Sequence, residues 1–169
     1  MRAAVLREFN APLSLEEVAD PICPENGVVL EVLACGVCRS DWHGWTGEHA
    51  RVKPGQIGGH EYCGRVVEAG PDARYRTGDD VIAPFILACG MCNSCQSGHS
   101  NTCPDQVAPG FTLPGAFAEY IAVPYDHNLA VLPKAMSPAL AAGLGCRVTT
   151  AWHALTGRAQ SRAGEWVAV

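Results

Sequence analysis

Four cysteines lie close together in one short polar loop, at a spacing that suits metal binding. Cys89, Cys92, Cys95 and Cys103 follow the pattern C-x2-C-x2-C-x7-C. Four thiolates at such spacings hold structural zinc tetrahedrally and close the site to water. The pattern therefore predicts a structural zinc. Two disulfides, or buried thiols without a ligand, are the alternatives; a reducing compartment disfavours the first and a glycine-containing polar loop the second.

A second group of candidate ligands is scattered along the chain. Cys38 follows one stretch with strand character and His60 precedes another, and glycines stand close before both, so the two side chains could meet at neighbouring strand ends. Cys146 sits between two stretches of helical character, where Gly145 allows close approach. By themselves Cys38 and His60 are weak indications, because a lone cysteine or histidine is more often a satisfied interior residue.

Longer motifs around these residues carry a resemblance to a known family. They are GVCRSDWH at residues 36–43, GGHEYCGRVVEAG at 58–70, GDDV at 78–81, the four-cysteine loop at 89–103 and GCRVTTAWHAL at 145–155. In this order they resemble the N-terminal part of a zinc-dependent alcohol dehydrogenase of the medium-chain dehydrogenase/reductase superfamily. The resemblance implies a catalytic zinc held by Cys38, His60 and Cys146, the ligand set known for alcohol dehydrogenase, with a fourth position open to water or substrate.

The resemblance also implies roles for residues beside these ligands. Ser40 would accept the alcohol proton and pass it, through the cofactor ribose, to His43 near solvent; a hydroxyl and an imidazole can each give and take a proton. Asp41 would orient the imidazole of His60. Glu61 would lie close behind the metal, with a simple pairing to an arginine as the alternative.

Cofactor and substrate contacts follow from the same resemblance. Arg39 matches a position that contacts the cofactor pyrophosphate, and a surface salt bridge is its alternative role. Thr150 matches a residue beside the nicotinamide. Trp45 and Phe85 are candidates for the substrate pocket, although either could be a core residue. The implied cofactors are two zinc ions per chain and NAD or NADP.

The pattern of the chain predicts a mainly β domain, because short β-branched stretches alternate with turn residues. The expected strands cover residues 2–6, 13–18, 27–35, 62–69, 80–84, 117–123 and 129–132. At Ser137 the pattern becomes helical, and Gly143 and Gly145 are expected to interrupt the helix before it resumes at Thr149. Residues 164–169 have the character of a buried strand that enters a dinucleotide-binding fold.

Together with the resemblance, these elements define the expected domains. Residues 1–136 are predicted to form a GroES-like, partly open β-barrel with short helices, which carries the structural zinc loop at 89–103. Residues 137–169 would hold linking helices and the first strand of a Rossmann α/β domain that is mostly missing. A buried strand makes a poor chain end, because nothing remains to pair with it, so a truncated enzyme is expected.

Composition excludes several classes of partner. With 169 residues, 48% hydrophobic and 17% charged, the chain is typical of a soluble globular domain. No stretch approaches the roughly 20 apolar residues of a bilayer span, and the start lacks the apolar core of a signal peptide, so we expect a cytoplasmic protein. The net charge of −5 and singly scattered lysines and arginines disfavour nucleic acid. Of nine cysteines, Cys23, Cys35 and Cys63 are expected to serve packing only.

The expected function is that of the whole enzyme: hydride transfer between a small alcohol and NAD(P), giving an aldehyde or ketone. The fragment alone is expected to be inactive, and the full-length enzyme to be a homodimer or homotetramer. One alternative is a non-enzymatic zinc-stabilised β-module, which would need only the four-cysteine loop. Another is a polyol or formaldehyde-type dehydrogenase of the same superfamily; Cys146, where polyol enzymes commonly have glutamate, leans against the polyol branch.

Overall fold

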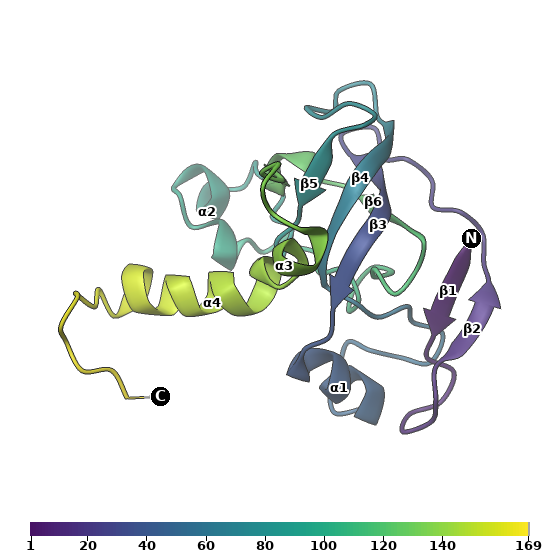
Figure 1. The fold of residues 1–169 in the computed structure, drawn as a ribbon, viewed down its shortest axis with the longest axis horizontal. Coiled ribbons are helices and arrows are strands. Elements are labelled where there is room, and N and C mark those ends of the chain that lie inside the picture. Colours follow the sequence, from purple (N-terminus) through teal and green to yellow (C-terminus); the bar gives the residue numbers. More distant parts are fainter. Residues whose placement is uncertain (169) are drawn as a thin grey trace.

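The computed structural model describes residues 1–168, and its centre is an antiparallel sheet of five strands in the order β6-β3-β4-β5-β7 (Figure 1). The bounds are Tyr120–Val123 for β6, Val28–Gly36 for β3, Glu61–Ala69 for β4, Asp80–Ile82 for β5 and Ala130–Val131 for β7. The two long strands, β3 and β4, pair from Val28↔Ala69 to Gly36↔Glu61. Because this register places the end of β3 beside the start of β4, the motifs around Cys38 and His60 are neighbours.

The core of the molecule lies against this sheet. Along β4 the buried Val66 lies between the exposed Arg65 and Val67, as expected for a strand with one face against the core. The core side chains are mostly β-branched or aliphatic, and their removal from water supplies the main stabilising term. The largest cluster includes Val28, Leu30, Tyr62, Val66, Val81, Leu87, Ile121 and Val123.

A separate two-stranded sheet, β1 (Arg2–Val5) with β2 (Ser14–Glu17), flanks the central one at the N-terminal side (Figure 1). The segment expected as one strand over 117–123 pairs with both sheets. Residues 120–123 form β6 of the central sheet, whereas Phe117 O accepts the N–H of Ala4 at 2.7 Å and Ala118 forms a bridge with Ala3 of β1. This segment joins the two sheets. Among residues 1–168 the strands form an open arrangement with few short helices, which confirms the predicted mainly β, partly open architecture.

The helices are short, and several end within one or two turns. They are α1 (Arg39–Thr46), α2 (Asn93–Gln96), the 3₁₀ turns η1 (Ser100–Thr102) and η2 (Asp126–Asn128), α3 (Pro138–Ala142), η3 (Leu144–Val148), α4 (Thr149–Trp152) and η4 (His153–Arg158). Ser137 is the expected N-cap of α3, since its hydroxyl accepts the N–H of Leu140 at 3.4 Å. No helix in the described part of the chain is both long and apolar enough to cross a bilayer.

The expected interruption is present at Gly143, where α3 ends at Ala142 with Gly143 as its C-cap, but absent at Gly145, which lies inside η3. The chain continues as one helical rod through η3, α4 and η4 (Figure 1). Gly143 keeps right-handed helical torsions, φ −70° and ψ −10°, and from Leu144 the hydrogen bonds widen to the π pattern. Glycine makes a break available but does not impose one, and here the backbone bonds are satisfied by widening the helix.

The strand expected over residues 164–169 is also absent from the described residues. Gly164 lies in a turn with φ +94°, and residues 165–168 form no strand, while Val169 lies outside the described residues. Trp166 is fully exposed, and this segment runs away from the sheet (Figure 1). A strand needs a neighbouring strand to bond with, and residues 1–168 provide none at this position.

Candidate metal centres

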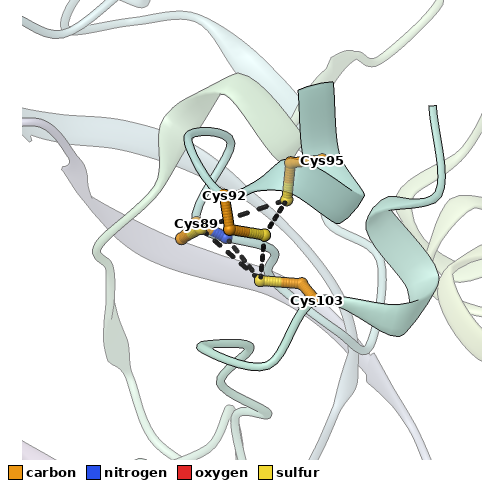
Figure 2. Close-up of side chains that lie close together, drawn as sticks. All are labelled: Cys89, Cys92, Cys95 and Cys103. Carbon is orange, nitrogen blue, oxygen red and sulfur yellow. Dashed lines mark hydrogen bonds between the residues drawn. The ribbon is translucent and has the colours of Figure 1, made fainter. Parts of the chain in front are cut away.

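The four cysteines of the 89–103 loop converge on one point. Figure 2 shows their sulfurs facing one another, and all four lie within 4.8 Å of each other. Neighbouring sulfurs are separated by 3.5 Å (Cys92–Cys95 and Cys89–Cys103), 3.8 Å (Cys92–Cys103) and 4.0 Å (Cys89–Cys95). Zinc–sulfur bonds of about 2.3 Å at tetrahedral angles would place sulfurs about 3.8 Å apart. The thiols therefore fit a structural zinc.

Tight turns and backbone amides shape this loop around its sulfurs. Gly90 has φ +77°, a conformation that favours glycine, and a Cβ there would lie 2.7 Å from the ring of His127. Hydrogen bonds from the amides of Met91 and Cys92 lower the pKa of Cys89 to about 7. Such amides stabilise a thiolate, which is the form that binds metal.

The second cluster draws its three residues from three separate elements. Cys38 is the N-cap of α1, His60 directly precedes β4, and Cys146 lies in η3. The donor atoms of all three lie within 4.8 Å of one another, and the sulfur of Cys38 is 3.2 Å from Nε2 of His60. A zinc bound to sulfur at about 2.3 Å and to nitrogen at about 2.0 Å spans such a separation to within a few tenths of an ångström. The expected convergence is present.

Asp41 lies where it can orient His60. Its Oδ1 is 3.0 Å from Nδ1 of His60, and its Oδ2 accepts the N–H of Cys38 at 2.9 Å. These contacts place the ring with Nε2 toward the two thiols and hold the turn that carries Cys38. A carboxylate behind a histidine is the usual support of a metal ligand.

The electrostatics of this cluster favour a cation. Burial opposes protonation of His60, but hydrogen bonds with Asp41 and Cys146 outweigh it and raise the pKa of His60 to about 10. Burial also opposes ionisation of Cys38, yet hydrogen bonds from Ser40 and the nearby His60 lower its pKa. The cluster thus stabilises positive charge between sulfurs, as a site for a divalent cation must.

Gly145 brings the helix that carries Cys146 against the sheet. A Cβ at Gly145 would lie 2.3 Å from the carbonyl oxygen of Ala83, so only glycine fits there without movement. The carbonyl oxygen of Gly145 accepts the N–H of Phe85 at 3.0 Å. The close approach expected at Gly145 is therefore observed, although the helix does not break.

Glu61 is buried and paired with an arginine. Its side chain is 0% exposed, and its carboxylate bonds Arg147, whose Nε lies 3.0 and 3.1 Å from the two carboxylate oxygens. The arginine pairing considered from the sequence is present, but its partner was not identified there. The signal was available, because a buried carboxylate needs a cation and Arg147 directly follows Cys146.

The two proposed proton-transfer residues lie on α1. The amide of Ser40 donates to the sulfur of Cys38 at 3.3 Å, which places Ser40 beside the three-ligand cluster. Nδ1 of His43 is 2.6 Å from Glu48, and the His43 side chain is 40% exposed. Solvent contact suits a residue at the outer end of a proton path. Sequence reasoning missed Glu48, which no local pattern marks out.

Arg39 and Thr150, the two residues expected to contact a cofactor, are exposed. The guanidinium of Arg39 stacks over Trp42, with 3.9 Å from Cζ to the ring centroid. None of the ion pairs among residues 1–168 involves Arg39. The salt bridge considered as its alternative role does not form in this part of the chain.

The two candidate pocket residues lie beside different cavities. Trp45 lines an apolar cavity of about 440 Å³ and donates its indole N–H to Ala11 O at 2.6 Å. Phe85 lines a larger cavity of about 830 Å³ that Thr150 also lines. Phe111, which the sequence did not indicate, lines the first cavity and packs against His60 at 4.9 Å between centroids.

Comparison with known families agrees with this fold and these clusters. Residues 24–134 match the model of the alcohol dehydrogenase GroES-like domain. The chain belongs to this family, the zinc-type alcohol dehydrogenases of the medium-chain dehydrogenase/reductase superfamily.

Individual proteins and solved structures are also similar to this chain. An alcohol dehydrogenase of Geobacillus stearothermophilus is 37% identical over 173 residues, covering 100% of this chain and 50% of that protein. A D-arabinose 1-dehydrogenase (NADP(+)) of Saccharolobus solfataricus is 35% identical over 156 residues, covering 91% of this chain and 44% of that protein. A crystal structure of an NAD-dependent alcohol dehydrogenase superposes with a TM-score of 0.89 at 28% identity, covering 98% of this chain and 49% of that one. The chain spans about half the length of the curated relatives it matches.

Proposed function

We propose that the protein is a zinc-dependent oxidoreductase that transfers hydride between an alcohol and NAD(P), giving an aldehyde or ketone. The observation that carries the proposal is the convergence of Cys38, His60 and Cys146, far apart in the chain, to within 4.8 Å. Bound there, zinc would supply Lewis-acid stabilisation of the alcohol oxygen. The second zinc of each chain would be structural, in the four-cysteine loop.

The chain's own residues would bind, orient and move protons. Asp41 holds the imidazole of His60 in place. Ser40 would receive the alcohol proton and His43, partly in solvent, would release it, since both groups can accept and donate. Arg39 would bind the cofactor pyrophosphate with its fixed cation, and Thr150 would lie beside the nicotinamide.

The substrate class in this proposal is a small alcohol or aldehyde. Relatives act on different alcohols, as their names state, and include both NAD-dependent and NADP(+)-dependent proteins. Trp45 and Phe85 line cavities near the cluster and remain the candidates for substrate contact. Assembly as a homodimer or homotetramer in the cytoplasm is part of the proposal and rests on the resemblance alone.

Zinc stoichiometry tests the proposal against the rival of a zinc-stabilised binding module. We expect two zinc ions per chain by elemental analysis of the purified protein. Cys146→Ser should remove one of them and Cys95→Ser the other, because the two clusters share no ligand. One zinc per chain, insensitive to Cys146→Ser, would favour the module and end the proposal.

A further inference from the structure

Arg147 joins the three chain segments that carry the candidate catalytic ligands. Its backbone N–H donates to Oε1 of Glu61 at 3.1 Å, its Nε bonds both carboxylate oxygens, and its Nη2 donates to Glu61 and, at 3.1 Å, to the carbonyl oxygen of Val37. Each of the three residues is the sequence neighbour of one ligand: Val37 precedes Cys38, Glu61 follows His60 and Arg147 follows Cys146.

Besides the contact between Cys146 and His60 themselves, these bonds are the polar link between the helix of Cys146 and the segments that carry the other two ligands. Within residues 1–168, the backbone hydrogen bond that joins η3 to the segment after β5 is donated by the N–H of Phe85 to Gly145 O, and Phe85 lies beside no ligand in the sequence. A planar guanidinium can bond both oxygens of a carboxylate and still reach a third acceptor. Arg147 uses this geometry to span Glu61 and Val37 at once.

The surroundings are shaped for this ion pair. The Glu61 side chain is 0% exposed and that of Arg147 is 55% exposed, so a cation at the surface reaches a carboxylate in the interior. Gly36 faces Glu61 in the β3–β4 register. A Cβ at Gly36 would lie 2.6 Å from Oε2 of Glu61 and 3.3 Å from Nη2 of Arg147. Glycine at this position leaves the space that the pair occupies.

We propose that Arg147 is a positioning residue that assembles the three-ligand metal site by clamping its own helix against the segments at Val37 and Glu61. The inference rests on the proposed function, since it concerns the same ligands. It gives Arg147 a role in positioning those ligands, in addition to balancing the charge of Glu61. Lysine, a single point of charge, cannot reproduce the clamp.

The first test is Arg147→Lys, which keeps a cation facing Glu61 and so does not leave that buried carboxylate unpaired. We expect zinc affinity at Cys38, His60 and Cys146 to fall about 10–100-fold, the usual range for groups that orient metal ligands, while the four-cysteine site is unchanged. Competition with a chromophoric chelator measures the affinity. The visible absorption of cobalt bound in place of zinc reports a change in ligand geometry that a general loss of stability would not cause.

Arg65→Lys is the matched control. Nε and Nη2 of Arg65 bond Asp80 at 2.7 and 3.0 Å, in a pair of the same kind that touches no ligand segment. Arg65→Lys should leave zinc affinity and the cobalt spectrum as in the wild type. Equal losses in Arg65→Lys and Arg147→Lys would overturn the clamp, because the effect would then be general.

A double variant separates positioning from charge balance. Arg147→Met with Glu61→Gln leaves no buried charge unpaired and keeps only the backbone N–H of residue 147 as a donor to residue 61, so the guanidinium bonds that tie the three segments are lost and affinity should stay low. Recovery to wild-type affinity, or wild-type affinity in Arg147→Lys, would overturn the clamp while leaving the proposed function intact. A wild-type protein that holds one zinc, in the four-cysteine site alone, would overturn the proposed function and the clamp together.

Discussion

At the scale of single residues, Gly145 decides where Cys146 lies. The space at its α-carbon is filled by the carbonyl oxygen of Ala83, 2.3 Å from the position of a Cβ. Gly145→Ala must therefore push the helix away from the chain after β5 and carry the sulfur of Cys146 with it. We expect the variant to bind one zinc per chain instead of two, by elemental analysis, with the four-cysteine site still filled.

Gly143→Ala is the matched control for this steric argument. The nearest atom to a Cβ at Gly143 is Leu140 O at 3.6 Å, an ordinary contact, and its torsions are helical. Alanine there should keep both zinc ions and add about 0.5–1 kcal/mol of stability, because glycine is a poor helix former. If Gly143→Ala lost zinc as Gly145→Ala does, close packing against Ala83 would not be the cause.

At the scale of elements, the four-cysteine loop depends on its metal more than the sheet does. Its helices α2 and η1 have four and three residues, too short to be stable alone. Its small hydrophobic cluster consists of Ala88, the four cysteines and the partly buried Tyr125. Metal binding must supply the folding free energy that such a loop lacks.

Removing zinc should therefore unfold the loop before the sheet. After treatment with a chelator at neutral pH, we expect proteolytic cleavage within residues 89–103 while the five-stranded sheet keeps its circular dichroism. Cys95→Ser should show the same cleavage without chelator. A zinc-free sample, checked by elemental analysis, whose loop resists protease as well as the untreated protein does would contradict this expectation.

At the scale of the whole molecule, residues 1–169 by themselves are expected to be inactive. All strand pairings among β1 to β7 are antiparallel, whereas a dinucleotide-binding fold is built on parallel strands that aim a helix N-terminus at the pyrophosphate. In the proposed function the described residues would contribute Arg39 and Thr150 to cofactor binding, but they contain no such parallel-stranded unit.

Nicotinamide absorbance tests this directly. A sample of residues 1–169 that carries two zinc ions per chain should reduce neither NAD nor NADP in the presence of primary or secondary alcohols. Measuring zinc in the same sample excludes an empty site as the reason. Alcohol-dependent reduction by this chain alone would show that hydride transfer needs no further domain.

The local elements were largely predictable, and the departures have physical causes. Alternating β-branched stretches predicted the seven strands, because the period of two needs only neighbouring residues. The uninterrupted helix at Gly145 and the missing strand at 164–168 were not predicted. Glycine permits a break without requiring it, and a strand's existence depends on a partner that local sequence does not reveal.

The sequence by itself determined the four-cysteine loop, since its ligands lie within one short segment and its turns are formed by glycines and polar residues. Motif resemblance also indicated Cys38, His60 and Cys146. Only the tertiary structure decided that these three meet, that Glu61 takes Arg147 as its partner, and that Trp45 and Phe85 face different cavities. Contacts between residues tens of positions apart depend on strand register and on how closely a helix can pack, and no local pattern encodes those distances.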